Sequence, residues 1–170
     1  MCALCLLLLT VVTTARAQEP DSTSIHHRWR EHHDEITLLA GYHQGRNGFV
    51  EFGVGRNRHG TNQHPYDMAY YLGTEVQVNR PELVGVKVGA YVDGGVAMGV
   101  QLIQYFEGGE GCTVFRPEIG IGLFKLKVTY AYNIGLAAKR LTGINTHMIS
   151  LTYAFRMLRL PGDDDKRSPH

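Results

Sequence analysis

Histidines form the densest group of side chains in this sequence that could bind a metal ion. They lie close together near the start of the chain, at His26, His27, His32 and His33. Imidazole is a good ligand for zinc, copper and nickel, and on a helix His26 and His33 would lie close to one face. The alternative is a solvated leader that is rich in histidine by composition alone. We therefore expect no cofactor and keep these four histidines as candidate metal ligands.

A nucleophile beside a base would be the other chemistry to look for. The nearest histidine and serine are His147 and Ser150. Their positions have opposite parity in a strand, so their side chains would point to opposite faces. Cys112 follows a glycine-rich turn and has no histidine beside it in the sequence, which is not the setting of an activated thiol. We expect no catalytic residue and no enzyme activity.

Composition excludes several classes of protein. The 170 residues carry 17 Lys and Arg against 16 Asp and Glu, for a net charge of +1. A nearly neutral chain argues against nucleic-acid binding. Glycine is abundant, at 20 residues, but it has no fixed period, which excludes a collagen.

Residues 1–17 are predicted to be a secretory signal peptide. The run from Ala3 to Val12 is apolar except for Thr10, and Ala15-Arg16-Ala17 follows as a small-x-small cleavage pattern. The run is shorter than the roughly 20 residues that a helix needs to span a bilayer, although an uncleaved anchor is the competing interpretation. An exported chain without a later long apolar run is periplasmic, secreted or a barrel in an outer membrane.

The rest of the chain reads as one all-β domain between two polar segments. Residues 18–34 are predicted to be a flexible leader and residues 158–170 a polar tail, whereas residues 35–157 alternate between apolar and polar side chains with a period of two. Turn residues divide this domain into eight candidate strands, at 35–44, 47–57, 68–79, 83–93, 97–107, 112–123, 126–136 and 146–157. Short connections of about five residues suit an antiparallel up-and-down order.

The two faces of these strands differ in composition. One face interleaves glycines with six charged residues, three of each sign: Glu51, Glu75, Glu118, Lys87, Lys127 and Arg156. In a narrow closed barrel, glycines relieve crowding inside, and confined charges must pair because an unpaired charge costs several kcal/mol. We therefore predict that these six side chains form a charge network inside a filled barrel.

The other face is almost entirely apolar, and we predict that it faces lipid. Tyrosines on this face or near strand ends suit a membrane–water boundary, although tyrosine is also a good strand residue in general. The predicted lipid-facing residues are Val84, Val86, Val88, Ile119, Ile121, Leu123, Val128, Tyr130, Tyr132, Leu151, Tyr153 and Phe155.

Three motifs carry a resemblance to a known class of protein. They are Arg116-Pro117-Glu118-Ile119-Gly120-Ile121-Gly122, Val128-Thr129-Tyr130-Ala131-Tyr132-Asn133 and Ile149-Ser150-Leu151-Thr152-Tyr153-Ala154-Phe155. With them the chain resembles the small eight-stranded outer-membrane β-barrels of diderm bacteria, in particular uncharacterised ones. The last motif is similar to the insertion signal read by the barrel-assembly machinery, although fifteen residues follow Phe155.

The resemblance implies an all-β, eight-stranded antiparallel up-and-down transmembrane β-barrel in the cell outer membrane. Its implied partners are outer-membrane lipids and, during insertion, the barrel-assembly machinery, with no nucleic acid. We expect a structural or interaction role without a defined activity. The alternatives are a soluble periplasmic ligand-binding β-barrel and a barrel enzyme that modifies lipid A.

Overall fold

The computed structural model describes residues 32–60, 66–123, 125–136 and 141–160, and all of their regular structure is β-strand. The predicted signal peptide, most of the leader and the end of the tail lie outside the described residues. The first five strands are β1 (His32–Gln44), β2 (Gly48–Gly60), β3 (Tyr66–Gln77), β4 (Arg80–Gly94) and β5 (Val96–Glu107). The others are β6 (Glu110–Leu123), β7 (Leu126–Tyr132), β8 (Ile134–Gly135) and β9 (His147–Arg159).

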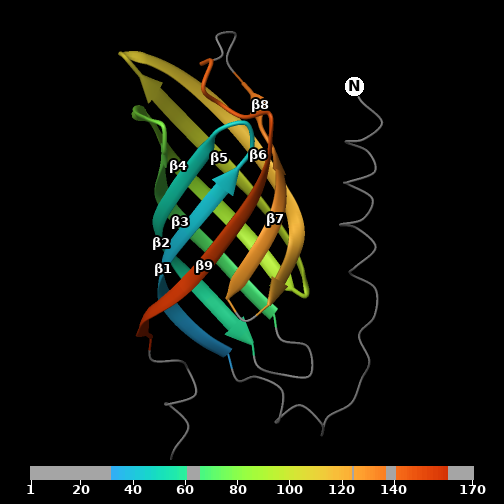
Figure 1. Cartoon of the computed structure of the whole chain (residues 1–170). Coiled ribbons are helices and arrows are strands. Elements are labelled where there is room, and N and C mark those ends of the chain that lie inside the picture. Colours follow the sequence, from blue (N-terminus) through green and yellow to red (C-terminus); the bar gives the residue numbers. More distant parts are fainter. Residues whose placement is uncertain (1–31, 61–65, 124, 137–140, 161–170) are drawn as a thin grey trace, which may run out of the picture.

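These strands form one antiparallel sheet that closes on itself (Figure 1). Strands β1 to β6 each pair with the next in sequence, and β9 pairs with both β7 and β1 to complete the ring. Strands β7 and β8 both pair with β6, so they occupy one place, and the ring has eight. The prediction of an all-β, antiparallel sheet of eight strands is confirmed at this level.

The turn between β5 and β6 has the residue types that its backbone conformation favours, whereas the turn between β6 and β7 does not. Glu107 pairs with Glu110 across Gly108 and Gly109, whose φ angles are +58° and +87°. Glycine adopts positive φ without a steric penalty, which suits a two-residue hairpin turn. Between β6 and β7, Lys125 has a φ of +74° although no glycine or asparagine is present there.

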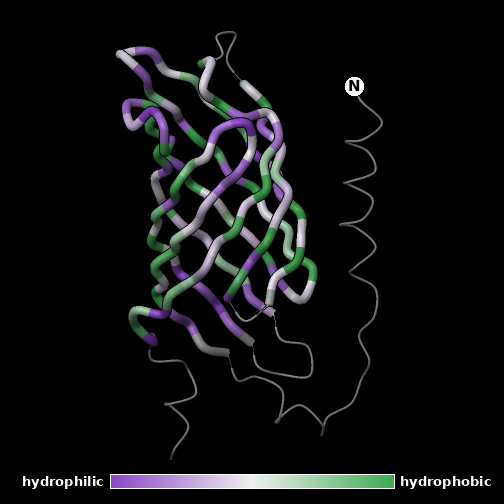
Figure 2. Tube along the Cα trace, in the orientation of Figure 1, coloured by the Kyte–Doolittle hydropathy of each residue, from purple (hydrophilic) through white to green (hydrophobic). Residues whose placement is uncertain are grey.

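Buried and exposed residues alternate along most of each strand, for example on β3, β4 and β7. Figure 2 shows hydrophilic and hydrophobic residues interleaved along the strands. On β4, Lys87 and Tyr91 are buried, whereas Val86 and Val88 are 46% and 53% exposed. The outer wall is therefore apolar and the interior holds charge, which reverses the usual arrangement of a water-soluble protein.

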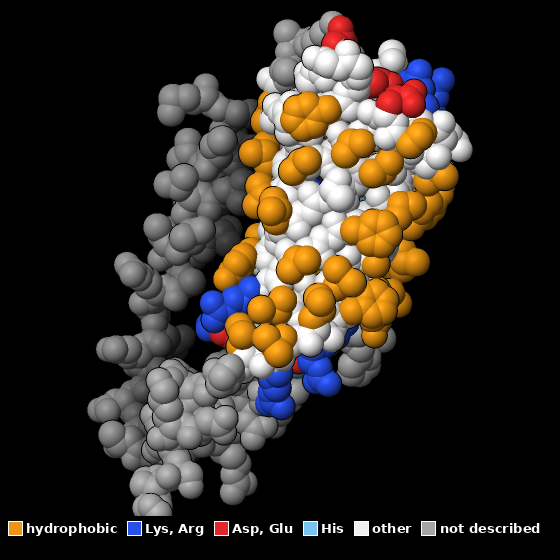
Figure 3. Space-filling model, turned by 90° about the vertical axis from the view of Figure 1, so that its left-hand side faces the viewer, with side chains coloured by type: hydrophobic (Ala, Val, Ile, Leu, Met, Phe, Trp, Pro, Cys, Tyr) orange, Lys and Arg blue, Asp and Glu red, His pale blue; other side chains and the backbone are white. Residues whose placement is uncertain are grey.

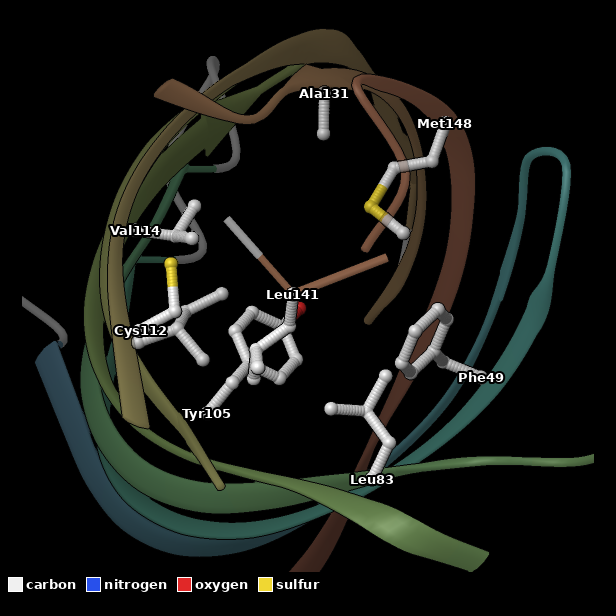
Figure 4. Close-up of a cluster of buried hydrophobic side chains, with 9 residues drawn as sticks. Phe49, Leu83, Tyr105, Cys112, Val114, Ala131, Leu141 and Met148 are labelled. Atoms are coloured by element: carbon white, nitrogen blue, oxygen red, sulfur yellow. The ribbon is translucent and has the colours of Figure 1, made fainter. Parts of the chain in front are cut away.

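An apolar layer fills one end of the ring, which we call the upper end because β1 ends and β9 begins there. Leu141, from the segment that joins β8 to β9, lies in the middle of the ring among inward side chains of the strands (Figure 4). The layer consists of Phe49, Leu83, Ile103, Tyr105, Cys112, Val114, Ala131, Leu141 and Met148.

Two asparagines connect this segment to the turn between β1 and β2. Asn145 Nδ2 donates to the carbonyl oxygen of Asn47 at 2.7 Å, and the backbone N–H of Asn47 donates to Asn145 Oδ1 at 2.8 Å. Asn47 Nδ2 also donates to the carbonyl of Gly143 at 2.9 Å. The segment around Leu141 and Asn145 therefore covers the upper end of the interior.

Inward glycines make room for large inward side chains. A Cβ added at Gly89 would lie 2.7 Å from Tyr71 Cζ, and one added at Gly85 would lie 2.9 Å from the ring of Tyr105. Tyr71 belongs to a smaller apolar layer nearer the lower end, with Leu39, Ala69, Tyr91 and Ala154. The abundance of glycine on one face thus has a packing reason.

Candidate functional site

A network of buried charged side chains lies between the two apolar layers, and Glu75 on β3 is its centre. Arg116, on β6, donates from Nη1 to Glu75 Oε2 and from Nη2 to Glu75 Oε1, both at 2.8 Å. Tyr105 Oη also donates to Glu75, and Arg116 Nη2 donates to Tyr105 Oη at 2.6 Å. This bidentate pair joins two strands that are three places apart in the ring.

Lys87 on β4 extends the network to the first two strands. Its Nζ lies 2.7 Å from Glu75 Oε2 and 3.0 Å from Glu51 Oε1. Glu51 Oε2 is in turn 2.7 Å from His43 Nε2. His43, Glu51, Glu75 and Lys87 are all buried. The two carboxylates therefore contact charged partners inside the ring in place of water.

A second ion pair lies on the lower side of Glu75. Lys127 Nζ donates to Glu118 Oε1 at 2.5 Å and sits 4.2 Å from the centre of the Tyr91 ring. Gln101 connects the two parts, because its Nε2 donates to Glu118 Oε2 at 3.1 Å and its Oε1 accepts from Arg116 Nη1 at 3.2 Å. The charges therefore form one connected interior network.

The network is electrically balanced when His43 is neutral. Its carboxylates are Glu51, Glu75 and Glu118, and its cations are Lys87, Lys127 and Arg116. Such a set can hold strands in register across the ring, since each charge finds a partner at hydrogen-bond distance. Most of its polar atoms contact one another, although the buried His43 Nδ1 has no hydrogen-bond partner among the described residues.

One of the six predicted charges does not belong to this network. The side chain of Arg156 is 60% exposed and lies 3.6 Å from Glu35 Oε1 at the lower end of the ring. Thr37, which pairs with Arg156 on β1, is buried, but the register between β1 and β9 shifts directly beside this pair, between Ile36 and Thr37. Alternation predicts the face on which a side chain lies and not its height along the ring, and Arg156 lies where the interior opens.

Arg116 takes the place that was predicted for Arg156, and His43 is a further member that the prediction missed. Both were accessible from the sequence, because Arg116 has the same parity as Glu118 on one strand and His43 has the same parity as Gly41 on another. The interior contribution of Tyr105 follows from the same rule.

The predicted apolar face lies on the outer surface. Val84 is half-buried, and the side chain of Leu123 is outside the described set. The others are exposed by 37–67%: Val86, Val88, Ile119, Ile121, Val128, Tyr130, Tyr132, Leu151, Tyr153 and Phe155.

The candidate metal ligands are largely beyond what the structure describes. His26 and His27 lie outside the described residues, and of His32 and His33 only the backbone, at the start of β1, is described. Within the described residues no group of three or more His, Cys, Asp or Glu side chains is placed to hold a metal ion.

His147 and Ser150 lie on opposite sides of β9. His147 is exposed, and its Nδ1 is 2.5 Å from Tyr130 Oη, whereas Ser150 is fully buried. Cys112 is buried beside a small hollow of about 30 Å³ under the segment that carries Leu141 and Asn145. No helix among the described residues has the length and apolar character to cross a membrane.

A smaller charged group lies on the outer surface at the lower end of the ring. Asp34 on β1 accepts from Arg56 Nη2 at 2.6 Å and from Arg58 Nε at 3.0 Å. Together with Met68 and Tyr70, these three residues line a hollow of about 220 Å³.

Comparison of the chain with protein-family models, with curated proteins and with solved structures gave no match.

Proposed function

We propose that this chain is an outer-membrane β-barrel with a filled, ion-paired interior, and that it serves as a structural or interaction component of that membrane. The observation that carries the proposal is the outer wall. Large apolar side chains project from the wall around the ring, while the six charged side chains of the interior network are buried within it. Figure 3 shows this for one face, where hydrophobic side chains cover the wall and charged ones gather towards its ends.

A water-soluble monomer rarely exposes an apolar patch of more than a few hundred Å². On this ring, exposed apolar residues occur on every strand, among them Phe52, Leu72, Val88, Leu102 and Leu151. In a lipid bilayer, this exposed apolar surface would be the normal exterior of a membrane barrel.

The height of the apolar wall supports the same proposal. On β5 the outward residues run from Val96 to Phe106. Ten steps of about 3.4 Å give about 34 Å along the strand, and a tilt of about 40° reduces this to a height of roughly 25 Å. The outward apolar band of membrane barrels has a height of about 25 Å.

Aromatic side chains flank the wall at both ends. Tyr42 and Tyr132 are exposed near the upper end, and Tyr66, Tyr70 and Phe155 near the lower end. Tyrosine suits a membrane–water interface because its ring is apolar while its hydroxyl remains hydrated. The two groups are consistent with interfacial girdles.

Two other functions are weaker proposals. A soluble ligand-binding barrel would need an interior cavity and a covered wall, yet paired charges and apolar layers occupy the interior. A lipid-modifying enzyme would need a nucleophile and base that face each other, and His147 and Ser150 lie on opposite sides of β9. Osmotic-shock release without detergent would favour the soluble barrel, and altered lipid A on overproduction would favour the enzyme.

An arginine introduced on the outer wall tests whether lipid or water surrounds the wall. Val88 lies near the middle of the wall and Val96 at its lower rim, and both are about half exposed. We expect Val88→Arg to destabilise the chain folded in lipid vesicles by about 2–4 kcal/mol and Val96→Arg by about 0–1 kcal/mol. In water both changes would stay within about 0.5 kcal/mol, as exposed substitutions usually do.

The measurement is reversible unfolding in vesicles, together with fractionation of expressing cells with and without detergent. Co-sedimentation with the outer membrane, heat-dependent gel mobility and a larger penalty at Val88 than at Val96 are the expected results. Release without detergent, or equal and negligible penalties at both positions, would reject the membrane proposal.

A further inference from the structure

We propose that the outer surface formed by Asp34, Arg56, Arg58, Met68 and Tyr70 is a binding site for the phosphodiester headgroup of an anionic glycerophospholipid. The inference rests on the proposed membrane function and goes beyond it, because it assigns a lipid class to one place on the wall. These residues line a hollow of about 220 Å³ on three neighbouring strands, β1, β2 and β3.

The position of the two arginines on β2 is the first support. Outward residues of this strand are Phe52 and Val54 in the wall, followed by Arg56 and Arg58 towards the lower end. The guanidinium groups therefore begin where the apolar wall stops, which in a membrane is the depth of the lipid phosphates. Acyl chains of a lipid bound here would lie against Leu72 and the neighbouring wall.

Charge and hydrogen-bonding capacity are the second support. Two guanidinium groups and one carboxylate leave the group with a net charge of +1, which matches the single negative charge of a phosphodiester. Each guanidinium carries five N–H donors in a planar fork that suits phosphate oxygens. Asp34 engages Nη2 of Arg56 and Nε of Arg58 and so holds the two forks side by side.

The apolar members of the group are the third support. Across the β2–β3 pairing, Arg56 is opposite Tyr70 and Arg58 is opposite Met68. Tyr70 is 57% and Met68 55% exposed. Cationic groups beside an exposed aromatic and a flexible thioether match an amphiphile, which has a charged head and an apolar body.

The test uses the full chain in neutral-detergent micelles, titrated with phosphatidylglycerol or with phosphatidylcholine, with bound lipid counted by native mass spectrometry. We expect tighter binding of phosphatidylglycerol, and about fivefold weaker binding of it in Arg56→Gln and in Arg58→Gln, since each arginine near a membrane surface contributes about 1 kcal/mol. Phosphatidylcholine binding should stay unchanged.

Arg80→Gln is the matched control. Its side chain is 48% exposed, as that of Arg56 is, but it pairs with Glu107 near the upper end of the ring. Equal affinity for the two lipids, or the same loss in Arg80→Gln as in Arg56→Gln, would overturn the inference. Displacement of phosphatidylglycerol by millimolar inorganic phosphate would overturn it as well, because it would indicate a site for the free anion.

The same preparation distinguishes failure of this inference from failure of the proposed function. A chain that integrates into phosphatidylcholine vesicles and shows no preference for phosphatidylglycerol retains its membrane function and loses only this site. A chain that remains in the aqueous phase with both lipids contradicts the membrane proposal and the lipid site together.

Discussion

The pair of Glu75 and Arg116 offers a quantitative test of whether charge balance holds the interior together. Removing the cation with Arg116→Met leaves the network with one excess negative charge, and Glu75→Gln leaves one excess positive charge. Breaking a buried pair from one side costs about 3–5 kcal/mol, because the remaining charge is buried without compensation. We expect each single variant to lower the free energy of unfolding by about this amount.

The double variant, Glu75→Gln with Arg116→Met, restores neutrality, since Glu51 remains with Lys87 and Glu118 remains with Lys127. Its remaining cost comes from three neutral partners of the pair that each lose a hydrogen bond, at about 1 kcal/mol each. These partners are Tyr105, Gln101 and Asn133. We therefore expect the double variant to cost about 3 kcal/mol, against a sum of about 6–10 kcal/mol for the single variants.

The assay is equilibrium unfolding by urea in detergent micelles, followed by the far-ultraviolet circular dichroism of the strands. Arg80→Met is the control for loss of an arginine at the surface, and it should cost less than about 1 kcal/mol because the Arg80 side chain is 48% exposed where it pairs with Glu107. Costs that add to within about 0.5 kcal/mol in the double variant would refute charge balance as the cause. So would a cost for Arg116→Met no larger than that for Arg80→Met.

Two further changes test the upper end of the ring. Asn145→Ala removes two hydrogen bonds to Asn47, worth about 2 kcal/mol together, so labelling of buried Cys112 by a thiol reagent should speed up roughly 30-fold. Asn79→Ala, in an exposed turn at the same end, is the control and should leave the labelling rate unchanged. An unchanged labelling rate in Asn145→Ala would contradict the conclusion that the segment around Leu141 and Asn145 covers the upper end of the interior. Gly109→Ala should lower the free energy of unfolding by about 1–2 kcal/mol, because φ there is +87° with open space around it, and Gly109→Asn should cost less. Urea unfolding measures both, and equal costs would argue against backbone strain.

The sequence predicted the faces of the strands well because alternation with a period of two is a local property. Lys87 and Val88 are neighbours in sequence, and their burial inside and exposure outside follow directly from that period. The glycine-rich turn at Gly108 and Gly109 could be predicted for a similar reason, since its backbone requirement is local.

Features that depend on contacts between distant parts of the chain were not predictable in the same way. The mistaken placement of Arg156 arose because period two contains no information on where a ring ends. The turn at Lys125 has a positive φ without the residue types that favour it, and Lys125 Nζ donates to Glu35 Oε2 at 2.6 Å from across the sheet. Tertiary contact outweighs local preference there.

The segment that covers the upper end was also missed. The sequence predicted only a connection between 136 and 146, yet Leu141 and Asn145 are buried within the ring. Their positions depend on Asn47, which is far away in sequence, and on the space left among inward side chains such as Leu83. A pattern read along one strand does not contain that information.

The pairing of β1 with β9 has a consequence for how the molecule is made. The other neighbouring strands in the ring follow one another in the sequence, with β8 sharing the place of β7. The pairing of β1 with β9 instead joins the first strand to the last, and it places Gln44 opposite Ile149. A growing chain therefore presents unsatisfied backbone groups on both open edges until its last strand has been synthesised. Folding must wait for the completed polypeptide, and a chain truncated before β9 would be prone to aggregation rather than partly functional.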